Sequence, residues 1–230
     1  MKILVIEDDP QIVEVVTTVV HIRWPEAEVI STHLGKRGLE LVEEESPSVV
    51  ILDIGLPDTS GYEIIRSIRL FSSVPLVILS SRDREIDIVK GLELGADDYV
   101  TKPFRHMELI SRVKTAIRRN PDARAEQMKL GELRFDPAIL EVFWKGRTIV
   151  LTHTEGDIFR LLMKNAGHVV TYNQLAEAVW GNDYAGATEA LKVHVRRMRE
   201  KIEIDPEKAQ LILTRPSAGY YLRVNQDSPD

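Results

Sequence analysis

Several stretches of this sequence end in side chains that could do chemistry. The clearest is Val49–Leu52, an aliphatic run typical of a strand buried on both faces of a parallel sheet, and it stops at Asp53. Ligands of open α/β sheets bind beyond the carboxyl ends of the strands, so an acid at this place is a candidate for chemistry. Asp is also a common turn former, and Asp53 considered alone fits either role equally well.

Other strand-like stretches carry polar residues at the same predicted edge. Lys2–Ile6 is followed by Glu7 and Asp8, whereas Asp9 before Pro10 predicts a helix cap. Two later short strands, residues 76–79 and 99–100, lead to Ser80 and to Lys102, respectively. The carboxyl ends of parallel strands share one edge of a sheet, so we expect these side chains to meet.

The chemistry of this set is specific. The carboxylates of Glu7, Asp8 and Asp53 would repel one another unless a hard cation lay among them, and Mg²⁺ prefers such oxygen ligands. Lys102 adds a positive charge and Ser80 a hydroxyl donor, so an anion with several oxygen atoms fits between them. A phosphoryl group is the anion that this set predicts.

The elements that position these residues alternate between strand and helix. Strands are expected at residues 2–6, 28–31, 49–52, 76–79 and 99–100, and helices at residues 10–20, 36–45, 61–70, 85–94 and 104–118. This alternation predicts a parallel sheet covered by helices.

The second half of the sequence has a different pattern. Short strands are expected between residues 130 and 150, and two capping boxes, Thr152 to Glu155 and Thr171 to Gln174, predict helix starts. In residues 189–202 a core stripe is expected from the apolar residues Leu191, Val195, Met198 and Ile202. A basic arc is expected from Lys192, His194, Arg196, Arg197, Arg199 and Lys201. This arc is either a solvated face or a helix that enters the major groove of DNA.

Composition limits the class of protein. The 230 residues favour two domains, and the net charge of −6 argues against a general polyanion binder. The absence of cysteine excludes disulfides, thiolate chemistry and Cys-type zinc sites. The sequence shows no apolar run that could span a bilayer and no signal segment, so a cytoplasmic protein without a membrane partner is expected.

The motifs IEDD, LDIGLPD, ILSS and DDYVTKPF together resemble the receiver domain of bacterial response regulators over residues 1–119. The resemblance implies a flavodoxin-like, doubly wound, five-stranded parallel sheet and Asp53 as acceptor of phosphate from a sensor histidine kinase. Asp8, Asp53 and the carbonyl of Gly55 would hold Mg²⁺, with Glu7 assisting through water. Lys102, before a cis proline bond, would pair with the phosphoryl oxygens.

The resemblance also implies a switch and a dimer face. Ser80 would be drawn toward the phosphoryl group, and Tyr99 would then turn inward. A homodimer formed on phosphorylation would use the charged residues Asp98, Glu108, Arg112 and Arg119. Ile88 stands where relatives generally have Lys or Arg, so a weaker dimer, or a more apolar one through Ile88, Val89, Leu92 and Ile110, is expected.

The strings LTHTE, AEAVWG, VHVRRMREKI and AGYYL resemble the effector domain of the OmpR/PhoB family. The resemblance implies a smaller α+β winged helix-turn-helix domain over residues 129–225. Residues 120–128 contain a proline and lack apolar periodicity, so a linker is expected there, and a disordered tail is expected at residues 226–230. The domain would bind double-stranded DNA as direct-repeat or tandem half-sites. The implied DNA contacts are Lys192, His194, Arg196, Arg197, Arg199 and Arg215, with Arg197 at base edges.

RNA polymerase would meet a loop that contains Gly181, Asn182, Asp183 and Tyr184. Some positions depart from the pattern: Glu189-Ala190 replace a usual Arg-Thr, Lys192 replaces a usual Asp, and Pro216 occupies the usual place of the wing arginine, with Arg215 displaced by one position. The operator sequence therefore cannot be transferred from relatives.

A phosphorylation-dependent DNA-binding transcription regulator is the favoured function, with no enzymatic activity beyond its own self-catalysed phosphorylation and dephosphorylation. An alternative is a DNA-binding regulator that works without phosphorylation. A remote alternative is a magnesium phosphotransferase with an Asp nucleophile. Such enzymes usually have a second acid two residues after the nucleophile, where this chain has Gly55.

Overall fold

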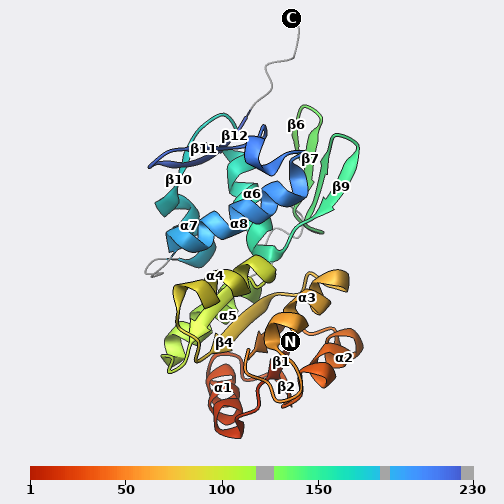
Figure 1. Cartoon of the computed structure of the whole chain (residues 1–230), viewed down its shortest axis with the longest axis vertical. Coiled ribbons are helices and arrows are strands. Elements are labelled where there is room, and N and C mark those ends of the chain that lie inside the picture. Colours follow the sequence, from red (N-terminus) through yellow and green to blue (C-terminus); the bar gives the residue numbers. More distant parts are fainter. Residues whose placement is uncertain (118–126, 182–186, 224–230) are drawn as a thin grey trace, which may run out of the picture. The chain divides into compact units, whose positions relative to one another are not determined.

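The computed structural model describes residues 1–117, 127–181 and 187–223. The chain divides into two compact units, Met1–Arg118 and Arg119–Asp230 (Figure 1). The linker expected at residues 120–128 lies largely outside the described part, and Met128 already belongs to a strand. The expected tail, residues 226–230, also lies outside the described part, and the predicted domain boundaries stay predictions.

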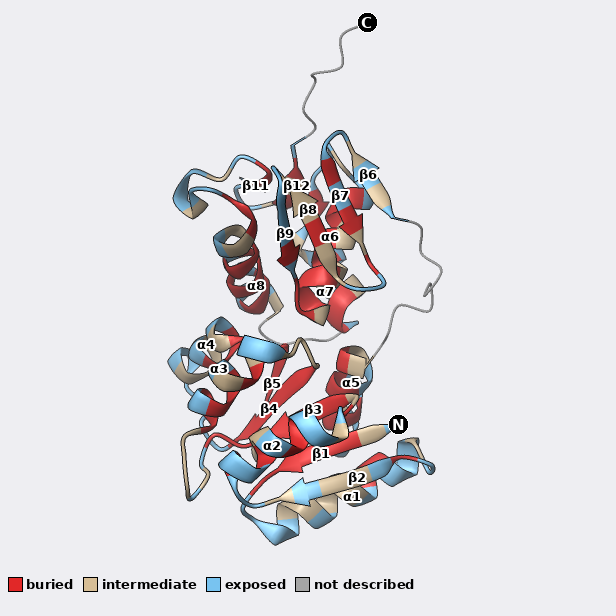
Figure 2. Ribbon diagram, turned by 90° about the vertical axis from the view of Figure 1, so that its right-hand side faces the viewer, coloured by how far each residue is buried: buried red, intermediate tan, exposed pale blue. Residues whose placement is uncertain are grey.

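The first unit contains a five-stranded parallel sheet in the order β2-β1-β3-β4-β5. Its strands are β1 (Lys2–Ile6), β2 (Glu28–Thr32), β3 (Val49–Leu52), β4 (Leu76–Ser80) and β5 (Asp98–Thr101). The three inner strands are buried along almost their whole length, as the aliphatic runs predicted (Figure 2). The expected doubly wound parallel fold is confirmed.

Helices cover both faces of this sheet. They are α1 (Pro10–Arg23), α2 (Gly35–Glu45), α3 (Gly61–Phe71), α4 (Glu85–Leu94) and α5 (His106–Ile117). Helices α1 and α5 contact each other and share one core with alternate residues of the strands, such as Ile3 and Val5. The contacts of α2 with α3 and of α3 with α4 form the other layer. Because successive side chains of a strand point to opposite faces, the same strands contribute to the hydrophobic cores on both sides of the sheet.

Helix α5 begins later than expected. It starts at His106, because the carbonyl of Arg105 accepts the first helical hydrogen bonds, from Glu108 and Leu109. Phe104, which we expected to open the helix, instead packs from a preceding loop against the core. Its apolar side chain made it look like part of the helical pattern.

The second unit begins with a four-stranded antiparallel sheet. Its strands, in sheet order, are β6 (Met128–Leu130), β7 (Leu133–Asp136), β8 (Glu141–Trp144) and β9 (Arg147–Val150). Lys145 and Gly146 connect β8 to β9 with φ values of 50° and 77°. Positive φ at both positions is the geometry of a tight hairpin turn.

Three helices and a small sheet complete the second unit. The helices are α6 (His153–Lys164), α7 (Tyr172–Trp180) and α8 (Ala187–Ile202), with a short 3₁₀ helix at Pro206–Lys208. The sheet has the order β10-β12-β11, from β10 (Val170–Thr171), β11 (Ile212–Arg215) and β12 (Gly219–Leu222). Both predicted capping boxes are present, at Thr152 and at Thr171. Three helices with a terminal β-hairpin confirm the expected winged-helix class.

Gly219 is required where the wing meets β10. A Cβ atom at this position would collide with the backbone of Val170 and lie 2.8 Å from Cα of Thr171. The close pairing of β12 with β10 therefore depends on a residue without a side chain.

Candidate functional site

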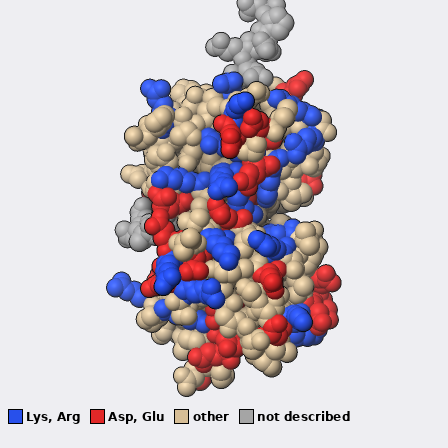
Figure 3. All heavy atoms as spheres, in the orientation of Figure 1, with Lys and Arg blue, Asp and Glu red and all other residues tan. Residues whose placement is uncertain are grey.

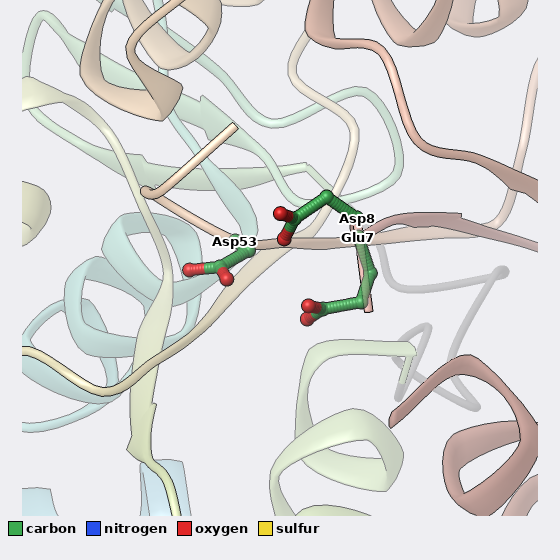
Figure 4. A group of neighbouring side chains, drawn as sticks. All are labelled: Glu7, Asp8 and Asp53. Atoms are coloured by element: carbon green, nitrogen blue, oxygen red, sulfur yellow. The ribbon is translucent and has the colours of Figure 1, made fainter. Parts of the chain in front are cut away.

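The acidic cluster, defined here as Glu7, Asp8 and Asp53, lies where β1 and β3 end. These strands pair with Ile6 beside Leu52, so the residues that follow them emerge next to each other. One ligand atom from each carboxylate lies within 4.8 Å of the others, and Figure 4 shows the three side chains together. The order of the strands reverses between β1 and β3, which is where ligands of such sheets bind.

Lys102 reaches the same cluster from the end of β5. Its Nζ donates to Glu7 Oε2 at 2.6 Å and to Asp53 Oδ2 at 2.8 Å. The Lys102–Pro103 peptide bond is cis, in agreement with the expectation. The structure thus brings Glu7, Asp8, Asp53 and Lys102 together, as the order of the strands predicted.

Burial and charge act against each other in this cluster. Burial raises the pKa of Glu7 to about 7, although the hydrogen bond and charge of Lys102 lower it. Burial alone would lower the pKa of Lys102, but its hydrogen bonds to Asp53 and Glu7 raise it above its usual value. Lys102 therefore remains a fixed positive charge beside Asp53 at neutral pH.

The cluster fits a hard divalent cation. All three groups offer carboxylate oxygens, two of them, Glu7 and Asp53, are buried, and Asp8 is exposed at the rim. Like charges this close are stabilised by a cation, and Mg²⁺ is typically bound by one or two carboxylates, water and a phosphate. The donor set is thus typical of a magnesium site.

The loop after β3 holds the Asp53 carboxylate in one orientation. Its Oδ1 accepts hydrogen bonds from the backbone N–H groups of Ile54, at 2.5 Å, and Gly55, at 3.2 Å. The loop then presses against the start of α3, where a Cβ atom on Gly61 would collide with the Asp53 carbonyl oxygen. This close approach explains why Gly opens α3, a role that the sequence pattern did not indicate.

The two predicted switch residues, Ser80 and Tyr99, are both buried. The Ser80 hydroxyl lies at the end of β4 and accepts a hydrogen bond from Arg82 N at 3.5 Å. The Tyr99 ring is 5% exposed, and its hydroxyl donates to the Arg82 carbonyl at 2.7 Å. Burial raises the pKa of Tyr99, while a hydrogen bond with Ser80 lowers it. Tyr99 is therefore already in the inward position.

A group of side chains that the sequence did not indicate links α3 to α4. The buried Tyr62 donates from its hydroxyl to Asp87 Oδ1 at 3.1 Å, and Lys90 Nζ lies 4.2 Å from the centroid of the Tyr62 ring. Arg82 NH1 lies 3.8 Å from Asp87 Oδ1. Tyr62 follows Gly61 directly, so this link begins at the Asp53 loop. In the sequence, the only signal of this link between α3 and α4 is an aromatic residue next to Gly61.

The expected dimer face is only partly available. Leu92 and Ile110 are 1% and 8% exposed, which contradicts the expectation that they offer apolar contact surface. They face the core because α4 and α5 each turn one stripe inward. Ile88 and Val89 are half-buried and remain at the surface.

The charged members of the dimer face pair within one chain. Arg112 lies 3.6 Å from Asp98 Oδ2 and 4.0 Å from Glu108 Oε1. Asp98 and Arg112 are both buried, whereas the side chain of Glu108 is 41% exposed. Arg119 lies outside the described residues.

The basic arc of α8 is narrower than expected. His194 and Arg197 are 0% and 8% exposed, so the expectation that both are presented to DNA is wrong for this structure. His194 lies against Trp180, and Arg197 lies 3.6 Å from the buried carboxylate of Glu155. The core stripe, which contains Leu191 and its predicted partners, is wide enough to include these two polar positions.

The exposed row of α8 contains both signs of charge. Lys192 pairs with Glu189 at 2.6 Å, and Arg196 pairs with Glu200 at 3.0 Å. Figure 3 likewise shows acidic and basic side chains interspersed over the displayed face of the second unit. The exposed part of the basic arc is therefore partly neutralised by acidic residues of the same helix.

Glu155 anchors the inner side of α8. Its carboxylate accepts from Lys201 Nζ at 2.5 Å and from Thr152 N at 2.9 Å, and it also faces Arg197. Burial alone would raise the pKa of Glu155, but the charges of Arg197 and Lys201 lower it below its usual value. The sequence identified Glu155 only as part of a capping box.

Arg199 links α8 to the wing. Its guanidinium donates to the Ile212 carbonyl at 2.8 and 3.0 Å and to Thr214 Oγ1 at 2.8 Å. Arg199 is thus half-buried, and part of its hydrogen-bonding capacity is used by β11. Arg215 and Pro216 are exposed at the wing turn.

The expected polymerase loop is mostly undescribed. Gly181 is exposed at the end of α7, with φ of 80°. Asn182, Asp183 and Tyr184 lie outside the described residues. No helix in the described ranges has the length and apolar character needed to cross a membrane.

Two family models match the chain. Residues 3–114 match the response regulator receiver domain, and residues 146–222 match the C-terminal domain of transcriptional regulatory proteins. Each match falls within one unit of the structure, and the second begins after strands β6, β7 and β8.

Solved structures give the same result. The chain is similar to the response regulator DrrB of Thermotoga maritima, an OmpR/PhoB homologue, with 35% identity over 96% of this chain and 98% of DrrB, at a TM-score of 0.51. It also resembles the fold of a RitR mutant, with 22% identity over 96% of this chain and 98% of that one, at a TM-score of 0.76.

Proposed function

Because the chain belongs to the OmpR/PhoB family of response regulators, we propose that a sensor histidine kinase phosphorylates Asp53 and thereby controls DNA binding. The chain is a response-regulator transcription factor with a receiver domain and a winged-helix DNA-binding domain. A receiver domain implies a kinase as partner, and a winged helix implies DNA. Members of these two families are generally not enzymes, and self-catalysed phosphorylation and dephosphorylation of Asp53 is part of the proposal.

One observation supports this proposal above the others: Lys102 bridges Glu7 and Asp53 within the acidic cluster, at 2.6 and 2.8 Å. A fixed ammonium group beside a buried carboxylate is complementary to a phosphoryl group bound to that carboxylate. A mere turn cap would not require this arrangement.

The transfer step uses a carboxylate oxygen of Asp53. This oxygen forms a bond to phosphorus while the bond between phosphorus and the imidazole nitrogen of the donor breaks, and that nitrogen keeps the electron pair. The N–H groups of Ile54 and Gly55 hold Oδ1 in place, so the Asp53 side chain is oriented before the donor arrives. Lys102 then pairs with the phosphoryl oxygens.

Asp8, Asp53 and the carbonyl of Gly55 would hold Mg²⁺, with Glu7 assisting through water. When bound, this ion neutralises negative charge on the oxygens of the transferred group. The proposed role of Glu7 and Asp8 is therefore to place a cation beside Asp53, where its charge would offset that of the carboxylates and of the incoming phosphoryl group.

Phosphorylation would then stabilise the inward state of Tyr99. The new dianion draws the Ser80 hydroxyl toward it, and this stabilises the arrangement in which Tyr99 donates to the Arg82 carbonyl. The surface of α4, β5 and α5 would pair with a second copy, through Ile88 and Val89 and the charged set. The dimer would bind direct-repeat or tandem half-sites, and the loop at residues 181–184 would meet RNA polymerase.

Incubation with acetyl phosphate and Mg²⁺, followed by intact-mass measurement, tests the phosphorylation step. We expect one phosphoryl group, stable in acid and labile in base, on the wild type and none on Asp53→Asn. An unmodified wild type that still binds a specific DNA site would favour a regulator that works without phosphorylation. Steady release of phosphate from many small phosphate esters would favour the phosphotransferase.

A further inference from the structure

The exposed row of α8 begins with an ion pair in a position suited to reading DNA. Glu189 and Lys192 lie three residues apart, so they share one face of the helix. Lys192 Nζ lies 2.6 Å from Glu189 Oε1, and the two side chains are 50% and 51% exposed. Glu189 lies in the first turn of α8, which starts at Ala187. The N-terminal residues of recognition helices are the ones that contact base edges.

We propose that Glu189 and Lys192 read one C·G base pair as a unit. This inference rests on the proposed function, in which α8 enters the major groove. Glu189 would accept a hydrogen bond from N4 of cytosine, and Lys192 would donate to O6 and N7 of the paired guanine.

The geometry of the pair matches that base pair. N4 of cytosine and O6 of guanine are joined by a hydrogen bond, so they lie about 2.9 Å apart at the groove edge. The carboxylate oxygen and the ammonium of this chain are 2.6 Å apart. An acceptor and a donor at this separation can each face the complementary group of the base pair without breaking their own contact.

The alternatives fit less well. An A·T pair offers the same order of donor and acceptor, N6 of adenine and O4 of thymine, but it has the thymine methyl group in place of the second guanine acceptor, beside charged groups that would lose water. A G·C pair in the opposite orientation reverses the order of donor and acceptor along the groove, so each charge would face a group of like polarity. The backbone phosphates would repel Glu189, so this residue is suited to a base edge.

Reversing the two charges tests the proposal. Full-length protein activated with beryllofluoride would select binding sites from a random duplex library, as wild type and as the double variant Glu189→Lys with Lys192→Glu. The double variant keeps the net charge and can keep the ion pair. We expect one C·G position of the wild-type site to become G·C, with a preference of about 5- to 140-fold in each case.

A second, more conservative variant keeps the proposal testable if the double variant does not fold. Glu189→Gln is close in shape, and Gln reads adenine, so the preference at that position should shift from cytosine toward adenine. A charge swap at Arg37 and Glu40, an i,i+3 pair on α2 of the receiver domain, is the matched control and should select the wild-type site.

The outcomes separate two failures. If wild type selects no sequence, the proposed function fails and the inference fails with it. If wild type selects a site and both α8 variants select the same site with the same preference, the inference alone is refuted, and the pair only stabilises the helix.

Discussion

Glu155 is a single buried carboxylate on which two basic side chains of α8 converge. It is fully buried, and its charge is balanced by Lys201 and Arg197. Removing one partner of a buried pair leaves an uncompensated charge, which typically costs about 3–5 kcal/mol. The orientation of α8 therefore depends on this residue.

We predict that Glu155→Gln destabilises the DNA-binding domain by about 3 kcal/mol at pH 7. The folded-state pKa of Glu155 is lowered, so its contribution is complete above the unfolded-state pKa and is lost as pH falls through the folded-state pKa. The wild type should thus lose stability below about pH 4.5, the ordinary pKa of Glu, more steeply than the variant.

Hydrogen exchange of amides in α6 and α8 would measure this effect, with Glu207→Gln as the exposed control. A variant as stable as the wild type at pH 7, with the same acid dependence, would contradict the role assigned to Glu155.

At the scale of elements, the loop after Asp53 packs directly against the start of α3. The loop passes so close to the helix that a Cβ atom on Gly61 would lie 2.7 Å from Cα of Ile54. A Cβ atom on Gly55, in the same loop, would approach only Asp53 Oδ2, at 3.9 Å. The two glycines offer a matched comparison.

We predict that Gly61→Ala lowers the free energy of unfolding of the receiver domain by about 1–3 kcal/mol, because backbone atoms must move to make room. Gly55→Ala should leave the free energy of unfolding almost unchanged. Urea unfolding followed by the fluorescence of Trp24 would compare them. Equal effects of the two substitutions would show that the close approach at Gly61 is not required.

The link from α3 to α4 gives a second prediction. Tyr62→Phe removes only the hydroxyl that donates to Asp87 and keeps the buried ring. A hydrogen bond to a charged group contributes about 1.5–3 kcal/mol, so the first turn of α4 should open more often. The Arg82 carbonyl, which accepts from Tyr99, should then be held less firmly.

Hydrogen exchange of α4 amides would detect this opening, and fluorotyrosine NMR would report the position of Tyr99. Tyr221→Phe, in the other domain, controls for loss of a tyrosine hydroxyl. If α4 exchange and the Tyr99 signal both match the wild type, Tyr62 does not couple the Asp53 loop to α4.

Sequence patterns predicted the elements better than the contacts between them. The aliphatic run at Val49–Leu52 predicted β3, and the order of strand ends placed Lys102 beside Asp53. The periodicity of α8 could not show that His194 and Arg197 face inward, because a polar residue can be buried when a partner such as Glu155 balances it. That partner is far away in the sequence.

The same limit applies in the receiver domain. Arg69 donates to Asp97 Oδ2 at 2.9 Å and to the Gly95 carbonyl at 2.8 Å, joining the end of α3 to the loop before β5. Asp97 also accepts from Leu76 N at 3.0 Å. The motif DDYVTKPF begins at Asp97, but the sequence did not indicate Arg69 as the partner of Asp97, because 28 residues separate the two and only the fold brings them together.

At the scale of the whole molecule, we predict a weak phosphorylation-dependent dimer. The resemblance implies a basic residue at the position of Ile88, which would meet Glu108 of a second copy, and Leu92 and Ile110 are buried. Ile88→Lys should restore a charge pair and tighten the dimer of the beryllofluoride-activated protein. Sedimentation velocity would compare it with Ile88→Gln, and a wild-type dimer already tighter than that of Ile88→Lys would contradict this view.

The central claim is that phosphorylation of Asp53 controls DNA binding by the whole chain. The most direct measurement is a titration of the selected duplex with full-length protein, with and without acetyl phosphate and Mg²⁺, for wild type and Asp53→Asn. We predict tighter binding of the phosphorylated wild type by about 5- to 150-fold, the usual range of coupling between two sites, and no change for Asp53→Asn. Equal affinity of phosphorylated and unphosphorylated wild type would contradict the account.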